Sequence, residues 1–278
     1  MTTPVSATPG FVRTDDGVDL FVRDWGEGPL LVFVASWSLP SDSWGYQMLA
    51  STRAGFRAVA YDRRGHGRSS DPGRGWDFDT LADDLDAIMR ARDLAGAVLV
   101  GHSMATGEIV RYLARHGAGR VAGIVLVGTI TPGLVRRATH PQGIDPAAFE
   151  AFRSQELGRD LSAWIEANME PFLTPQIPRG MRDWITGMVL GASLLALHDC
   201  NVAIGEADFS TDLARVAVPT LIVHGGRDVT CPPALTAQAT ARSLPHARLA
   251  MYDDAPHGLF LTHMERFNGD LLGFAKGL

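Results

Sequence analysis

The sequence predicts an α/β fold in which a mostly parallel, doubly wound sheet carries an inserted helical cap. Short apolar, β-branched runs alternate with helical patterns through most of the 278 residues, an order that builds parallel sheets with helices on both faces. The runs are nearly continuous in apolar residues, as in strands buried on both faces. The alternation stops over residues 132–207, where no convincing strand pattern occurs.

The expected strands can be placed one by one. Residues 18–24 alternate between apolar and polar side chains, which is typical of an outer antiparallel strand. Nearly continuous apolar runs predict buried strands at residues 30–35, 57–61, 97–100, 123–127 and 220–223, and a further strand is expected at residues 247–252.

Helical patterns separate these strands. Thr80 and Asp83 resemble a capping box, and the following apolar positions share one helical face. A second helix is expected over residues 104–115, ending near Gly117. A last helix follows Thr262 and Glu265. The apolar residues expected on the inner faces of the first and last helices are Leu81, Leu85, Ile88, Met89, Phe267, Leu271 and Phe274.

The segment 132–207 is expected to form a helical cap, inserted into a core domain made of residues 1–131 and 208–278. Prolines punctuate the segment at positions 141, 146, 171, 175 and 178, and its aromatic residues lie among helical stretches. Open α/β sheets bind ligands outside the carboxyl ends of their strands. We therefore expect the cap to cover that edge.

Composition excludes several function classes. A formal net charge of −6 argues against nucleic acid or an anionic membrane as partner, and no apolar run is long enough for a membrane span. Residues 1–10 lack the features of a signal peptide. Cys200 and Cys231 cannot form a disulfide framework, which predicts a cytoplasmic protein. No zinc or calcium spacing occurs, so no metal is expected.

The motif that carries chemistry follows the strand at 97–100. It reads Gly101-His102-Ser103-Met104-Ala105 and precedes a helix. This is close to the G-x-S-x-G elbow, in which a serine nucleophile sits on a sharp turn between strand and helix. Small residues are needed at both ends because side chains there would collide with the neighbouring strand or helix. Ser103 is therefore the candidate nucleophile.

A serine hydroxyl needs an imidazole to take its proton and an acid to orient that imidazole. On this architecture the acid and then the histidine follow the serine along the chain. Asp228 follows the strand at 220–223, and His257 follows the strand at 247–252. Both are expected at the same sheet edge as Ser103. The rival residues are His263, Asp253 and Asp254, which are placed less favourably.

The motifs together resemble the α/β hydrolases, and within them the cofactor-free bacterial haloperoxidases and aryl esterases. The resemblance rests on the elbow, on residues 61–69 (Tyr-Asp-Arg-Arg-Gly-His-Gly-Arg-Ser), on residues 42–44 and 268–272, and on Ala255-Pro256-His257-Gly258. It implies the α/β-hydrolase fold and ester or lactone hydrolysis through an acyl-enzyme on Ser103. It also implies perhydrolysis, in which peroxide attacks the acyl-enzyme, and no haem, metal or flavin cofactor.

One departure from the family pattern falls at the oxyanion hole. Members usually have His-Gly before an aromatic residue that donates its backbone N–H, and here the residues read Ala35-Ser36-Trp37. The resemblance assigns the oxyanion hole to the N–H groups of Trp37 and Met104. Three outcomes remain open: the loop tolerates Ser36, the Ser36 hydroxyl contacts substrate or oxyanion, or the loop is altered and ester hydrolysis is weak.

The expected partner is a small-molecule carbonyl substrate. The candidate substrate contacts are Ser36, His102, Trp164, Trp184 and Met188. Two alternatives stay open: a C–C bond hydrolase or lyase-like enzyme that uses the same triad, and a catalytically silent receptor on the same fold. The sequence does not identify the substrate or the oligomeric state.

Overall fold

The computed structural model describes residues 10–278, so the prediction made for residues 1–10 falls almost entirely outside the described residues. An eight-stranded sheet runs through the molecule in the order β1-β2-β4-β3-β5-β6-β7-β8. β1 (Gly10–Arg13), β2 (Asp19–Trp25) and β4 (Arg57–Tyr61) pair antiparallel in that order. All other neighbours are parallel.

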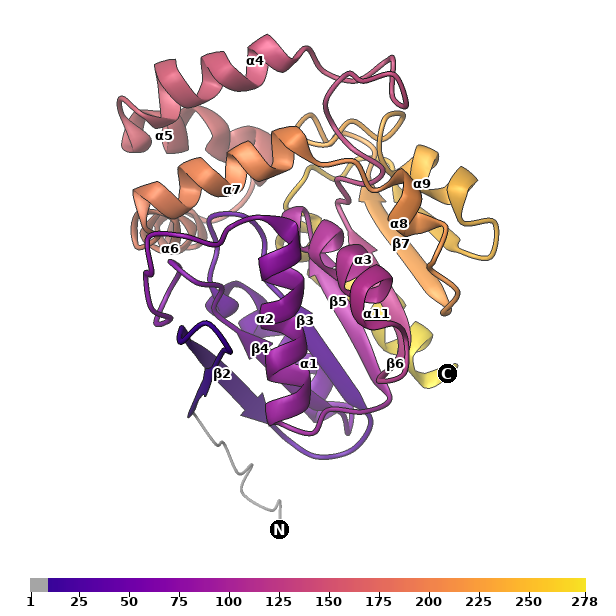
Figure 1. The fold of residues 1–278 in the computed structure, drawn as a ribbon. Helices are drawn as coiled ribbons and strands as arrows, with labels where there is room; N and C mark the ends of the chain where they lie inside the picture. Colours follow the sequence, from indigo (N-terminus) through magenta and orange to yellow (C-terminus); the bar gives the residue numbers. More distant parts are fainter. Residues whose placement is uncertain (1–9) are drawn as a thin grey trace.

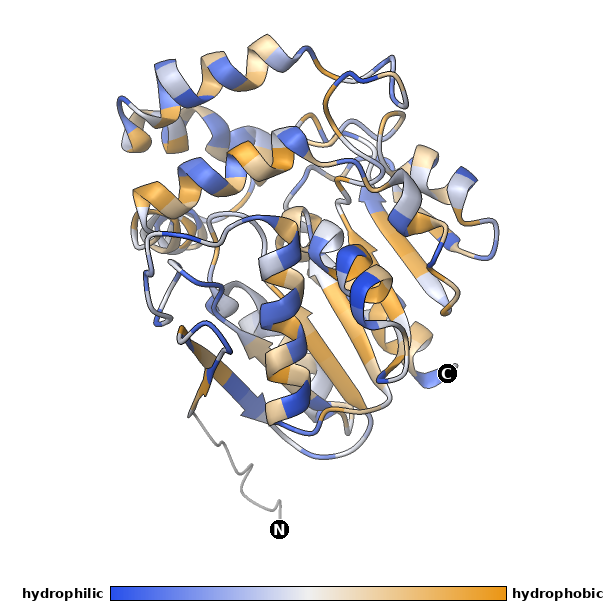
Figure 2. Cartoon of the chain, viewed as in Figure 1, coloured by the Kyte–Doolittle hydropathy of each residue, from blue (hydrophilic) through white to orange (hydrophobic). Residues whose placement is uncertain are grey.

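The strands with parallel neighbours include β4, which pairs in parallel with β3, and five others, all at predicted positions. These five are β3 (Leu30–Val34), β5 (Ala97–His102), β6 (Val121–Val127), β7 (Thr220–Gly225) and β8 (Arg248–Tyr252). β3, β5 and β7 are buried at every residue, and these strands are hydrophobic along most of their length in Figure 2. Sequence analysis missed β1, in which only Val12 is buried.

Helices cover both faces of the sheet (Figure 1). One layer contains α2 (Phe78–Ala91) and α3 (Met104–His116), whose apolar faces share a core with one side of the strands. The opposite layer contains α1 (Gly45–Arg53) and α11 (Met264–Lys276). Shorter helical segments are η1 (Ser41–Trp44), α8 (Ser210–Leu213), α9 (Ala237–Ser243) and α10 (Leu259–Thr262). This is the predicted doubly wound α/β architecture.

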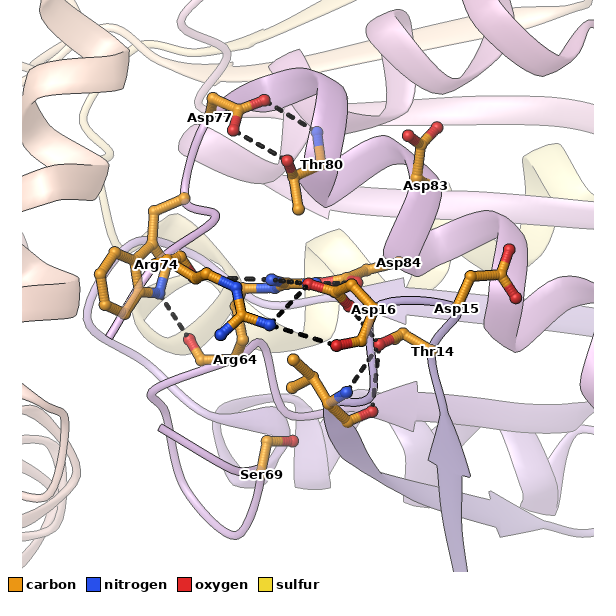
Figure 3. A network of polar contacts seen from close by, with 12 residues as sticks. Thr14, Asp15, Asp16, Arg64, Ser69, Arg74, Asp77, Thr80, Asp83 and Asp84 are labelled. Atoms are coloured by element: carbon orange, nitrogen blue, oxygen red, sulfur yellow. Dashed lines mark hydrogen bonds and ion pairs between the residues drawn. The ribbon is translucent and has the colours of Figure 1, made fainter. Parts of the chain in front are cut away.

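The start of α2 differs from the predicted capping box. Asp77 is the N-cap, and its carboxylate accepts hydrogen bonds from the backbone N–H of Thr80 at 2.9 Å and from its hydroxyl at 2.8 Å (Figure 3). Asp83 binds Arg115 instead. An aspartate three residues before the backbone N–H that it caps satisfies an otherwise unpaired donor, so the helix begins earlier than expected.

A buried guanidinium fastens the loop after β4 to its surroundings. Arg64 donates to the carboxylate of Asp84 on α2 at 2.6 and 2.7 Å and to Asp16 in the β1–β2 turn at 3.0 Å (Figure 3). The Arg64 side chain is 1% exposed. A bidentate arginine–carboxylate pair fixes direction as well as distance. The loop is therefore held in one orientation at the edge where ligands are expected.

Over residues 132–207, between β6 and α8, the chain contains helices and no named strand. They are α4 (Pro146–Ala151), the π-helical η2 (Phe152–Leu157), α5 (Leu161–Phe172), α6 (Arg179–Leu190) and α7 (Leu194–Glu206). Figure 1 shows α4 to α7 gathered beyond one end of the sheet, at the top of the view. Their arrangement is compatible with the predicted cap at 132–207, and its status as a separate domain stays a prediction.

Within residues 10–278, no single helix has the length and apolar character to cross a membrane. The bent pair α6 and α7 meets the length and composition criteria only when the two helices are taken together, across a 90° bend.

Candidate active site

Ser103 lies on the turn between β5 and α3 in a strained backbone conformation. Its φ is 56° and its ψ is −119°, and its backbone N–H donates to Val127 at 2.8 Å. A Cβ added at Gly101 would approach Ile109 Cδ1 to 2.6 Å and the backbone of Ala105 to 3.0 Å. The elbow therefore needs the small residues that the sequence supplies. Ser103 lines the mainly apolar pocket described below.

Asp228 and His257 follow neighbouring strands and meet. Nδ1 of His257 lies 2.6 Å from Oδ2 of Asp228, and both residues are at least 96% buried. A bond from Nδ1–H to a carboxylate leaves Nε2 of the neutral ring free to accept a proton. The other Asp228 oxygen accepts the backbone N–H of Cys231 at 2.8 Å.

The electrostatics keep the carboxylate of Asp228 charged. Burial acts to raise its pKa, but the neighbouring His257 and His224 and the N–H of Cys231 outweigh burial and lower the pKa below its usual value. Nε2 of His224 lies 3.3 Å from Oδ2. An ionised carboxylate against Nδ1 is what a general base requires for orientation and for stabilising its protonated form.

The rival residues are engaged elsewhere. His263 bonds to Thr262 at 2.8 Å and lies 3.3 Å from Asp254. Asp253 and Asp254 are exposed, and none of the three lines the pocket that contains Ser103 and His257.

His102 does not contact the pocket, contrary to the sequence-based expectation. It is fully buried, and its Nε2 lies 2.9 Å from the carbonyl oxygen of His257, to which it donates. Its ring lies 4.6 Å from the His257 ring and 4.8 Å from Phe260, measured between centroids. Burial holds its pKa well below the usual value. His102 is therefore a neutral support behind His257.

The candidate oxyanion donors come from the segments that follow two neighbouring strands, β3 and β5. Trp37 follows β3, and Met104 is the first residue of α3, where N–H groups have no partner within the helix. Ser36, Trp37 and Ser38 all line the pocket. Positive φ falls on Ser38, at 66°, and not on Ser36. A side chain at position 36 is therefore compatible with the backbone path.

Ser103 and His257 line a mainly apolar cavity of about 430 Å³ between the sheet edge and the helices α4 to α7. Ser36 and Trp164 line it as expected, but Trp184 and Met188 do not. The residues one position later on α6, Ile185 and Val189, take that place. The other apolar residues in the lining are Trp37, Leu39, Ile130, Leu134, Ile144, Ala148, Phe149, Phe152, Ile165, Met169, Phe172, Ile204 and Val229.

Trp184 faces a different neighbour, the ring of Tyr46 on α1, at a centroid distance of 5.9 Å. Adjacent helical residues point about 100° apart, so a shift of one position moves a side chain from the cavity to the outer contact. Within the lining, Glu156 is the only carboxylate, and no lysine or arginine occurs among the described residues that form it. The cavity suits a neutral, largely apolar molecule.

Cys231 is a further member of the site, and the sequence patterns assigned it no role there. It is fully buried, lines the cavity and lies with Asp228 and His257 in a group whose polar atoms are within 4.8 Å of one another. Three such ligands could hold a metal ion. Burial and the charge of Asp228 hold the pKa of the thiol well above its usual value, and Asp228 and His257 are already bonded to each other.

Comparisons with known proteins agree with this geometry. A family profile described as "alpha/beta hydrolase fold" matches residues 29–264. A non-heme chloroperoxidase of Streptomyces lividans is 41% identical over 96% of this chain and 99% of that one. A bifunctional esterase/perhydrolase of Acinetobacter calcoaceticus is 36% identical over the same shares.

Solved structures give the same answer. A bromoperoxidase from Bacillus anthracis superposes with a TM-score of 0.92 at 33% identity, covering 97% of this chain and 100% of that one. An esterase from Exiguobacterium antarcticum reaches 0.93 at 27% identity with the same coverage.

Proposed function

This chain belongs to the α/β-hydrolase family, and from that membership we propose that it is a serine hydrolase acting on carboxylic esters or lactones. Ser103 would form the acyl-enzyme, with perhydrolysis as a side activity. The observation that carries the proposal is the buried pair of His257 and Asp228, 2.6 Å apart, in the same pocket as Ser103. The names of the relatives, an esterase/perhydrolase and haloperoxidases, support both activities.

The mechanism follows from the roles of these groups. The substrate carbonyl oxygen points at the N–H groups of Trp37 and Met104, and the carbonyl carbon faces Ser103. His257 takes the Ser103 proton as the hydroxyl oxygen attacks, and Asp228 stabilises the imidazolium that forms. His257 then gives the proton to the leaving alcohol. Water, deprotonated by the same imidazole, releases the carboxylic acid and restores Ser103.

Perhydrolysis uses the same intermediate. Hydrogen peroxide replaces water as the attacking molecule, His257 takes its proton, and a peracid leaves while Ser103 regains its hydrogen. Perhydrolysis of an acetate requires space for an acetyl group only, whereas ester hydrolysis can also use larger acyl groups. The lining of apolar side chains with a single carboxylate, Glu156, favours neutral acyl and alcohol groups over anionic ones.

The test is a panel of short-chain esters, lactones and vinylogous diketones on native protein and on Ser103→Ala. We expect ester or lactone turnover that is lost in the variant, and labelling of native protein alone by a fluorophosphonate probe. Rapid diketone cleavage with slow ester turnover would favour the C–C hydrolase. Absence of labelling and of all turnover in native protein would favour the silent receptor and end the proposal.

A further inference from the structure

A buried arginine binds the short loop after β3. This loop, residues 35–38, is called the oxyanion loop. Arg63 donates through Nη2 to the carbonyl oxygen of Ala35 at 2.6 Å and through Nη1 to that of Ser36 at 2.9 Å. Its Nε donates to Glu108 on α3 at 2.8 Å, and Nη2 pairs with the same oxygen. Arg63 is 2% exposed and Glu108 is fully buried.

The cap helices bind the same loop through the side chain of Trp37. Nε1–H of the Trp37 indole donates to the carbonyl oxygen of Leu197 on α7 at 2.9 Å. The indole ring lies 5.3 Å from Trp164 on α5 and 6.1 Å from Phe152 on η2, measured between centroids, in edge-on contacts. One residue therefore carries both a candidate oxyanion N–H on its backbone and a cap anchor on its side chain.

The loop needs such support because its own backbone is poorly tied. Ser38 holds a φ of 66°, a region that costs a non-glycine residue energy unless its surroundings impose it. The hydrogen bond that closes the loop, from the Leu39 N–H to the Ser36 carbonyl, is long at 3.4 Å. The course of the loop therefore depends on Arg63 on one side and on the Trp37 indole on the other.

The cap is itself fastened at two other points beside the site. The N–H of Ser193, at the start of α7, donates to the Gly65 carbonyl at 2.8 Å. The N–H of Gly258, beside His257, donates to the Phe172 carbonyl at the end of α5, also at 2.8 Å. The position of the cap therefore affects both the oxyanion loop and the loop that contains His257.

We propose that Arg63 and the Trp37 indole are positioning residues for the oxyanion hole, and that docking of the cap completes that hole. The inference rests on the proposed hydrolase function for its catalytic consequence. Arg63 binds the carbonyl of residue 36, and in a planar trans peptide the N–H of the next residue points the opposite way, so the Trp37 N–H points away from Arg63. The hydrogen bond from the Trp37 indole to Leu197 on α7 then fixes the position of residue 37, and with it the position of its backbone N–H. A cap that moves away releases the donor.

The first test is Trp37→Phe, which keeps the backbone N–H and the aromatic contacts but removes the indole bond to Leu197. Loss of one oxyanion donor lowers kcat by about 10²–10³-fold, and we expect a displaced donor to lower it by at least about tenfold with KM nearly unchanged. Affinity for a trifluoromethyl ketone, which forms an oxyanion on Ser103, should fall by the same factor. Affinity for the product acid should not.

The matched control is Trp184→Phe, which removes an indole from the cap outside the cavity. It should leave kcat, KM and both affinities unchanged. The proposal is overturned if the two tryptophan variants behave alike while native protein turns over esters.

The second test removes the hydrogen bonds from Arg63 to the oxyanion loop without leaving an unpaired buried charge. In Arg63→Met/Glu108→Met both partners of the ion pair become apolar, an exchange that is often neutral for stability. We expect the double variant to fold with a lowered thermal midpoint, because the carbonyls of residues 35 and 36 lose their donor, and to show a kcat loss like that of Trp37→Phe. A folded double variant with native kcat would contradict the assignment of Arg63.

Hydrogen exchange separates failure of this inference from failure of the proposed function. Backbone amides in a peptide spanning residues 33–40 should exchange faster in Trp37→Phe and in the double variant than in native protein or Trp184→Phe. That readout needs no turnover. Faster exchange in the two variants, combined with no ester cleavage by native protein, would support the anchoring and reject the hydrolase. Unchanged exchange in the variants would reject the anchoring.

Discussion

Nδ1 of His257 lies 2.6 Å from Oδ2 of Asp228 because the two residues follow neighbouring parallel strands. β7 and β8 are paired so that Gly225 lies opposite Tyr252, and each strand then delivers its loop to the same sheet edge. Residues 29 positions apart in the chain are thereby brought into contact. The relationship depends on strand order and register, not on a local motif.

Asp228→Asn tests the proposed role of this carboxylate. An amide cannot stabilise the imidazolium and can impose the wrong tautomer on His257, so we expect kcat to fall by about 10³–10⁴-fold with little change in KM. Steady-state kinetics on the best ester of the panel measure it. Asp254→Asn, an exposed carboxylate beside His263, is the control and should retain native kcat. Equal losses in the two variants would refute the assignment.

Val189→Phe tests which face of α6 meets the substrate. Val189 lines the cavity and is 5% exposed, while Met188 does not line it. Because the larger ring takes up space in the cavity, we expect KM for a long-chain acyl ester to rise at least about tenfold and that for an acetyl ester to stay unchanged. Met188→Phe should change neither KM. A long-chain effect in Met188→Phe alone would restore the sequence-based assignment.

The strands and the three triad candidates could be predicted because buried parallel strands leave a strong apolar signature. Residues at their carboxyl ends share an edge whatever the details of packing. Ser103 was identified by the elbow motif, and Asp228 and His257 by that rule together with the chain order. β1 escaped because a four-residue edge strand with a single buried residue has no periodicity to detect.

The cavity lining could not be predicted at the level of single residues. On α6 the apolar positions occupy a broad face, and nothing local distinguishes Trp184 and Met188 from Ile185 and Val189, which point into the cavity. The hydrogen bonds from Arg63 to the carbonyls of residues 36 and 35 could not be predicted either, because they join residues 27 and 28 positions apart in the chain. Such contacts depend on three-dimensional packing.

Both cysteines should resist thiol reagents in the folded protein. Cys200 and Cys231 are free and fully buried. Burial raises the pKa of the Cys200 thiol to about 12 and that of Cys231 well above its usual value. Since the thiolate is the reactive form, Ellman's reagent at pH 8 should titrate neither thiol in native protein and both in guanidinium chloride. Fast reaction in native protein that disappears in Cys231→Ser would show instead that the cavity floor is open.

Acid should destabilise the protein partly through His66. Burial, with help from the nearby Arg63 charge, lowers the pKa of His66 to about 3, whereas an unfolded chain protonates near 6.5. Between these values the unfolded state binds more protons, so the stabilisation is complete above about pH 6.5 and is lost as pH falls toward 3. At one pKa unit per about 1.4 kcal/mol, His66 alone accounts for a loss of about 3 kcal/mol by pH 4.

The measurement is the free energy of unfolding in urea at pH 7 and pH 4 for native protein, His66→Gln and His246→Gln. His66→Gln removes the titrating group but retains an amide near the Arg64 carbonyl, which His66 contacts through Nδ1 at 3.0 Å, so its acid-induced loss should be smaller by about 3 kcal/mol. His246 is exposed, and its variant should follow native protein. Some acid sensitivity must persist in all three, because burial also lowers the pKa of His102 and His224. If His66→Gln loses as much stability as native protein, protonation of His66 is not coupled to unfolding.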